Sequence, residues 1–119
     1  MATLDKAALL ARKRTDRTDE VDLGDGTVTV RGLTRGEITR ARAAASRADK
    51  ADQVTTLDNH FIAAGLVEPE MTVAEVAEWL ESAPAGDSVA VLTAIQQLSG
   101  LAEGAQKSGV SGARKRSRR

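Results

Sequence analysis

The sequence predicts a mainly α-helical fold, a small domain of about four to five short helices with an N-terminal β-hairpin. One helix-start signal occurs twice, at residues 34–37 and 72–75, and each copy precedes apolar residues at helical spacing. Between residues 21 and 30 the apolar period changes to two around a glycine-flanked aspartate, which is typical of a hairpin. The length of 119 residues suits one such domain with some tail.

Three divisions are expected along the chain. Residues 1–20 hold a short helix over residues 3–13, capped by Thr3, followed by a polar linker. Residues 21–103 form the hairpin and the helical domain. Residues 104–119 are small, polar and basic, so they lack the apolar surface of a core and are expected to be disordered.

The hairpin is predicted from alternating apolar residues, which are Val21, Leu23, Val28 and Val30. Two glycines flank Asp25 in the middle of this segment, and both are expected to accept the positive φ of a tight turn. An isolated hairpin is barely stable in water, so we expect it to lie on the helices.

Four helices are expected after the hairpin. The first is capped by Thr34, runs to about residue 50 and carries an alanine-rich stripe, which lets another element approach closely. The second spans residues 56–67 and has apolar residues on two sides, so we expect it to be sandwiched. The last two follow caps at Thr72 and at Asp87 or Ser88.

The net charge of zero conceals a strong polarity along the chain. Residues 1–50 carry eleven Lys or Arg and eight Asp or Glu, a net charge of +3. Residues 51–106 carry nine acidic residues and no Lys or Arg, and residues 107–119 carry six basic residues and no acidic one. We expect an acidic middle and a basic end either to attract each other or to select different partners.

Several classes of chemistry are excluded or disfavoured by composition. The chain has no cysteine, so thiol catalysis and cysteine-ligated metals are excluded. His60 is the single histidine, which leaves no set of converging ligands or catalytic groups. No apolar run approaches the ~20 residues of a membrane span, and the N-terminus lacks a signal-peptide pattern. We therefore expect a cytoplasmic, non-enzymatic protein without metal or cofactor.

The helical surface is the predicted binding element. Trp79 is either a core residue or, at an edge, the anchor for a partner. The candidate partner-binding residues are Trp79, Leu80, Val91, Leu92, Ile95, Leu98 and Leu101, the last folded over a helix that ends near Gly100. Because alanine supplies much of the apolar content, stability is expected to be marginal and to benefit from self-association or from a partner.

The C-terminal basic run offers a second kind of contact, through Arg114, Lys115, Arg116, Arg118 and Arg119. Six basic groups, counting Lys107, are able to release counterions from nucleic acid, but no aromatic residue accompanies them for base stacking. The alternative is a solubilising tail or a docking peptide for an acidic surface, this protein's own included. We expect nucleic acid to be the less favoured partner.

Three segments together resemble tail assembly chaperones of long-tailed, siphovirus-type bacteriophages. They are VTVRGLTRGE at residues 28–37, FIAAGLVEPEMT at residues 61–72 and AIQQLSGL at residues 94–101. Their order and spacing after a short hairpin carry the resemblance, which covers about residues 20–106. The high Ala, Arg and Asp content suits a phage or prophage of an actinobacterial host.

The resemblance implies a non-catalytic assembly factor in the host cytoplasm. Such proteins coat the helical tape measure protein, recruit subunits of the major tail protein and are absent from the mature virion. The alternatives from the residues are a structural virion tail or connector protein, and a nucleic-acid-binding regulator acting through the Arg-rich tail. An N-terminal helix, the basic tail and an oligomeric state are not implied by the resemblance.

Overall fold

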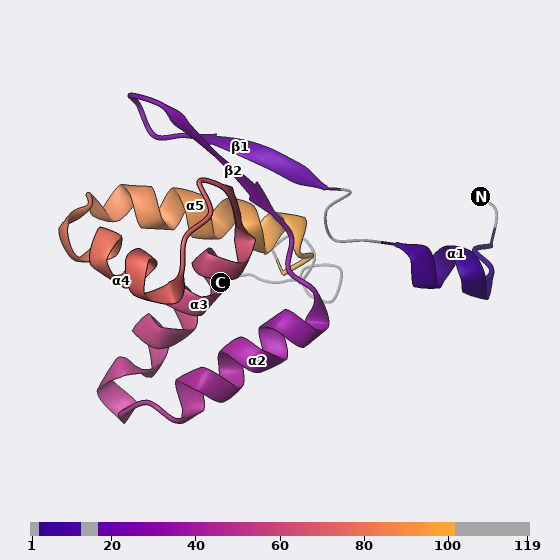
Figure 1. Ribbon diagram of the computed structural model, residues 1–119, viewed down its shortest axis with the longest axis horizontal. Coiled ribbons are helices and arrows are strands. Elements are labelled where there is room, and N and C mark those ends of the chain that lie inside the picture. The colour runs from indigo at the N-terminus through magenta and orange to yellow at the C-terminus, as the bar shows by residue number, and fades with distance from the viewer. Residues whose placement is uncertain (1–2, 13–16, 102–119) are drawn as a thin grey trace, which may run out of the picture.

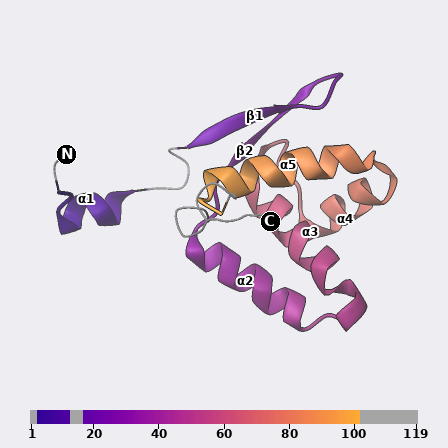
Figure 2. The same ribbon diagram turned by 180° about the vertical axis from the view of Figure 1, so that it is seen from behind.

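Helix α3 (Gln53–Gly65) lies at the centre of the fold in the computed structural model, which describes residues 3–12 and 17–101. It contacts three other helices, which are α2 (Arg35–Ser46), α4 (Val73–Ser82) and α5 (Ala85–Leu98). Figures 1 and 2 show α2 on one side of α3 and the α4–α5 pair on the other. A 3₁₀ turn, η2 (Lys50–Asp52), directly precedes α3. The predicted mainly α fold with an N-terminal hairpin is confirmed.

A three-stranded antiparallel sheet lies against α5 (Figures 1 and 2). Strands β1 (Thr18–Asp22) and β2 (Thr27–Arg31) form the expected hairpin, with Val21 opposite Val28. Strand β3 (Leu66–Glu68) pairs with the other edge of β2. The helices thus support the hairpin on one face, as its marginal stability in isolation requires.

The hairpin differs from its prediction in two details. Strand β1 begins at Thr18, within the segment expected to be a polar linker. The sequence did not predict this start, because the first three residues of the strand are exposed and polar. In the turn, only Gly24 has a positive φ, of 104°. The Gly24 N–H donates to Asp22 Oδ1 at 2.8 Å, so this aspartate closes the turn in place of a second left-handed glycine.

The end of α3 is also placed differently. A helix over residues 56–67 was expected, but α3 ends at Gly65 and the chain continues directly into β3. A Cβ atom at Gly65 would lie 2.5 Å from Cδ1 of Ile95, so the absence of a side chain lets α3 approach α5 closely. Leu66 then enters the core as part of the sheet, at 3% exposure.

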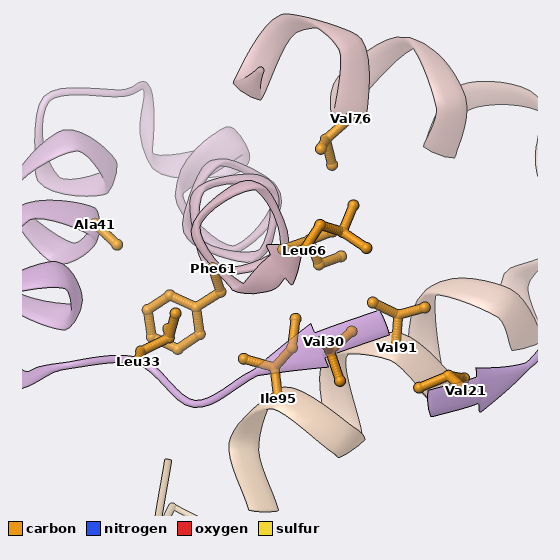
Figure 3. Packing of buried hydrophobic residues seen from close by; sticks show 10 residues of the cluster. Val21, Val30, Leu33, Ala41, Phe61, Leu66, Val76, Val91 and Ile95 are labelled. Atoms are coloured by element: carbon orange, nitrogen blue, oxygen red, sulfur yellow. The ribbon is translucent and has the colours of Figure 1, made fainter. Parts of the chain in front are cut away.

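The core fills the space between α3, α5 and the sheet. Figure 3 shows Val21, Val30, Val91 and Ile95 grouped at the sheet side, and Leu33 beside Phe61 towards α2. Its members are Val21, Val30, Leu33, Ala41, Phe61, Ile62, Leu66, Val76, Val91 and Ile95. Only one aromatic ring is among them, so the core is built mostly from branched aliphatic side chains.

Both predicted capping boxes are present. The hydroxyl of Thr34 accepts a hydrogen bond from the Glu37 N–H at 3.1 Å, and the Glu37 carboxylate accepts one from the Thr34 N–H at 3.0 Å. Thr72 and Glu75 repeat this reciprocal pair at the start of α4. These bonds satisfy amide groups that otherwise lack a partner at a helix N-terminus.

The prediction that Asp87 or Ser88 caps α5 is wrong. The helix begins at Ala85 after Pro84, without a side-chain cap, so Asp87 and Ser88 lie within its first turn. The Ser88 hydroxyl donates to the carbonyl of Ala85. The C-terminal end agrees with the prediction, because Gly100 has a φ of 79° and the half-buried Leu101 packs back on the core.

Helix α1 (Lys6–Ala11) lies apart from the other helices in both views (Figures 1 and 2). It is shorter than the expected helix over residues 3–13, and its cap is Asp5 rather than Thr3, since the Asp5 carboxylate accepts from the Ala8 N–H. All of its side chains are exposed, including Leu9 and Leu10.

Replacing Thr34 with alanine is expected to lower the free energy of unfolding by about 1 kcal/mol, because the Glu37 N–H loses its partner. Urea denaturation followed by the fluorescence of Trp79, the only tryptophan, measures this change. Thr39→Ala is the matched control, since Thr39 is exposed in the interior of the same helix. An equal loss in both variants would contradict the capping role.

Candidate partner-binding grooves

The structure divides the predicted partner-binding residues into two groups. Val91 and Ile95 have no exposed surface and belong to the core, so they are not available to a partner in this conformation. The apolar stripe that suggested a binding face is the side of α5 that packs on α3 and the sheet. The remaining five, which are Trp79, Leu80, Leu92, Leu98 and Leu101, are half-buried against the core.

Trp79 lines an apolar groove between α4 and the sheet, with a volume of about 240 Å³. Its other lining residues are Leu23, Val28, Leu66, Pro69 and Met71. Trp79 therefore lies at an edge between core and surface, the position from which we expected it to anchor a partner.

Leu80 and Leu92 line a second groove, formed by α3, α4 and α5, with a volume of about 320 Å³. We call it the α3–α5 groove. Its apolar part comes from these two leucines with Ile62, Ala77 and Val89, and its polar part comes from Thr55, Asp58, Asn59, Glu81 and Ser88. The mixture of a leucine-lined surface with carboxylates was not predicted, because it requires three helices to converge.

Two neighbouring polar residues of α3 give this groove its electrostatic character. Asn59 is 9% exposed, and its Oδ1 atom is buried without a hydrogen-bond partner in the described part of the chain. Burial raises the pKa of the Asp58 carboxyl above its ordinary value, because desolvation penalises the charged form. Among residues 3–12 and 17–101, the groove thus holds a carbonyl oxygen without a hydrogen-bond donor, a costly arrangement for a buried acceptor, beside a partly desolvated carboxyl group.

A third groove separates α2 from α3 at the start of α4, and its volume is about 470 Å³. We call it the alanine groove, because Ala41, Ala44, Ala63 and Ala64 line it. Its charged and polar lining residues are Glu37, Arg40, Arg47 and His60, and Thr72 and Val73 complete the wall. Of the alanine stripe predicted for α2, which comprised Ala41, Ala45 and Ala48, only Ala41 lines this groove. Ala44 comes from outside the stripe, and α3 adds a facing pair of alanines.

The remaining chemical candidates stay dispersed. His60 is half-buried in the wall of the alanine groove. Within residues 3–12 and 17–101, no three His, Cys, Asp or Glu side chains gather as a metal-binding group. Glu75, Glu78 and Glu81 are exposed on α4, as predicted.

The predicted basic contacts, Arg114, Lys115, Arg116, Arg118 and Arg119, lie outside the described residues, and so does the tail expected to be disordered.

None of the helices in the described part of the chain combines the length and apolar character needed to cross a bilayer. Comparison of the whole chain with models of protein families, with curated proteins and with solved structures gives no significant match.

Proposed function

We propose that this chain is a non-catalytic phage tail assembly chaperone that binds the tape measure protein and recruits the major tail protein in the cytoplasm of its host. The observation that carries the proposal is the alanine groove between α2 and α3. Together with the resemblance of residues 20–106 to that family, it supports a protein whose work is to hold a helix of another chain.

The groove suits an amphipathic helix for steric reasons. Alanine side chains end at Cβ, so a helix laid between α2 and α3 is able to bring its backbone close to both. Ala44, Ala63 and Ala64 remain half-buried and leave apolar surface for the partner to cover. A tape measure protein, being long and helical, offers many segments of this kind.

Charge adds a preference for one type of helix. Arg40 and Arg47 lie one on each side of Ala44 along α2, and both are exposed at the groove. Acidic residues flanking the apolar stripe of a partner helix complement them, which favours correct register and faster association more than raw affinity. We therefore infer an acidic amphipathic segment as the preferred ligand.

Two of the three segments that carry the family resemblance contribute residues to the wall of this groove. Residues 28–37 run from β2 through the capping box of α2, and residues 61–72 run from α3 through β3 to the cap of α4. Residues 94–101 form the end of α5 and its glycine turn. Residues 94–101 do not line the groove.

Co-expression with the tape measure protein tests the proposal. We expect the wild-type chain to raise the soluble fraction of that protein, and Ala44→Phe to remove the effect and weaken binding about tenfold or more, since the ring fills the groove. Ala43→Phe is the matched control, because Ala43 is exposed on the same helix and does not line the groove.

Unchanged solubility of the tape measure protein with the wild-type chain would overturn the proposal. Mass spectrometry of purified particles addresses the alternative of a structural tail or connector protein, since a chaperone is absent from the mature virion. A nucleic-acid regulator predicts steeply salt-dependent binding that disappears when residues 112–119 are deleted.

A further inference from the structure

We propose that the chain's own basic tail, residues 107–119, docks in the α3–α5 groove and places an arginine side chain against Asp58 and Asn59. This inference is independent of the tape measure proposal, because it concerns a different groove and a ligand within the same molecule. It assigns a self-occupied site to the surface that α3, α4 and α5 form together.

The acceptors in the groove call for a cationic donor. Asn59 is about nine-tenths buried and its Oδ1 has no hydrogen-bond partner among the described residues, which costs the full desolvation of that atom. A guanidinium has five N–H donors in a planar fork and no acceptor, so it suits the Asp58 carboxylate, and it reaches the Asn59 oxygen when that side chain turns towards the groove. A docked cation also stabilises the charged form of Asp58, whose burial otherwise opposes ionisation.

The apolar part of the groove fits the rest of an arginine side chain. Leu80 and Leu92 lie in the same lining as Asp58 and Asn59. Arginine buries its methylene stem along apolar surface while its head group makes polar contacts. The groove therefore offers the two kinds of surface that one arginine needs, side by side.

Charge complementarity favours the tail over other segments of the chain. Residues 51–101 carry eight acidic residues and no Lys or Arg, so no basic residue from this part of the sequence neutralises the groove. The tail carries six basic residues and no acidic one. Glu81 in the groove lining adds a second carboxylate for a neighbouring basic residue of the tail.

The tail is long enough to reach the groove. The described chain ends at Leu101, and the groove includes Ser88 and Val89 in the first part of α5. At a rise of 1.5 Å per residue, Ser88 lies about 15 Å from the end of α5 at Leu98. Residues 102–113 span up to about 40 Å when extended, so Arg114 reaches the groove with chain to spare.

Paramagnetic relaxation tests the docking in the full-length protein. The chain has no cysteine, so Ser117→Cys provides a single site for a nitroxide label. We expect strong loss of amide peak intensity at Asp58, Asn59 and Val89, and no loss along α2. At about 1 M salt, where the Debye length is about 3 Å, the loss is expected to disappear.

A pair of variants separates a specific site from general attraction. Asp58→Asn with Asn59→Ala is expected to abolish the intensity loss, whereas Glu75→Gln with Glu78→Gln removes two charges outside the groove and leaves it in place. If the first variant does not give a folded amide spectrum, Asp58→Asn alone is used for the comparison. This variant is expected to fold, because it removes a charge that burial disfavours.

Three results would overturn the inference. They are no intensity loss in the groove, loss spread evenly over the acidic surface of α4, and equal loss in both variants. Intensity loss that arises only when labelled and isotope-enriched chains are mixed would show docking on a second copy, which also contradicts a site for the chain's own tail.

Discussion

Replacing Ile95 with alanine is expected to lower the free energy of unfolding by about 2–5 kcal/mol. Ile95 has no exposed surface and packs in the core beside Val30 and Val91 (Figure 3), so truncation removes buried methyl groups and leaves a cavity. A loss of this size is a large fraction of the total free energy of unfolding of a typical domain, which is about 5–15 kcal/mol. Urea denaturation followed by Trp79 fluorescence measures it.

Val89→Ala is the control on the same helix, because Val89 is 62% exposed. A change within about 0.5 kcal/mol is expected there. If Ile95→Ala left the urea midpoint unchanged and abolished partner binding instead, Ile95 would be a contact residue, as the sequence pattern first indicated. The experiment therefore decides between a core role and a binding role for this side chain.

Replacing Gly32 with alanine is expected to cost about 1–3 kcal/mol of unfolding free energy, for a different reason. A Cβ atom at Gly32 would lie 2.6 Å from the carbonyl oxygen of Leu98 and 2.8 Å from its carbon. These are backbone atoms at the end of α5, so they have no rotamer by which to move away. The next residue is fixed too, since the Leu33 N–H donates to Ser99 Oγ at 2.7 Å.

Gly26→Ala is the comparison for this second variant. Gly26 also lies outside a helix, but no atom lies within 4 Å of its ideal Cβ position. We expect its unfolding curve to stay within about 0.5 kcal/mol of the wild type. The same denaturation series reports both glycines, and equal destabilisation would mean that the junction between β2 and α5 is looser than these distances indicate.

Local signals were the most reliable guide to this fold. The capping boxes at Thr34 and Thr72 are present because each involves residues three apart in the chain, whose geometry depends little on the rest of the molecule. Strand β3 was missed for the opposite reason. Three residues are too few to display a period of two, and Leu66–Glu68 becomes a strand only because β2 offers it an edge.

The candidate site was less predictable than the fold. An apolar stripe on a helix marks a buried side, but it does not say whether the cover is this chain or another, which is why Val91 and Ile95 were misplaced. The isolation of Asn59 within the α3–α5 groove had no signal in the sequence at all. It arises from the packing of three helices around one carboxamide.

One helix forms a wall of two grooves that open in different directions. Asn59 lines the groove towards α4 and α5, while the next residue, His60, lines the groove towards α2. A ligand that shifted the α3 backbone from one groove would therefore also move a wall of the other groove, and any change in affinity that resulted would be reciprocal. The position of the α3 backbone is thus a feature that both grooves share, although their lining residues differ.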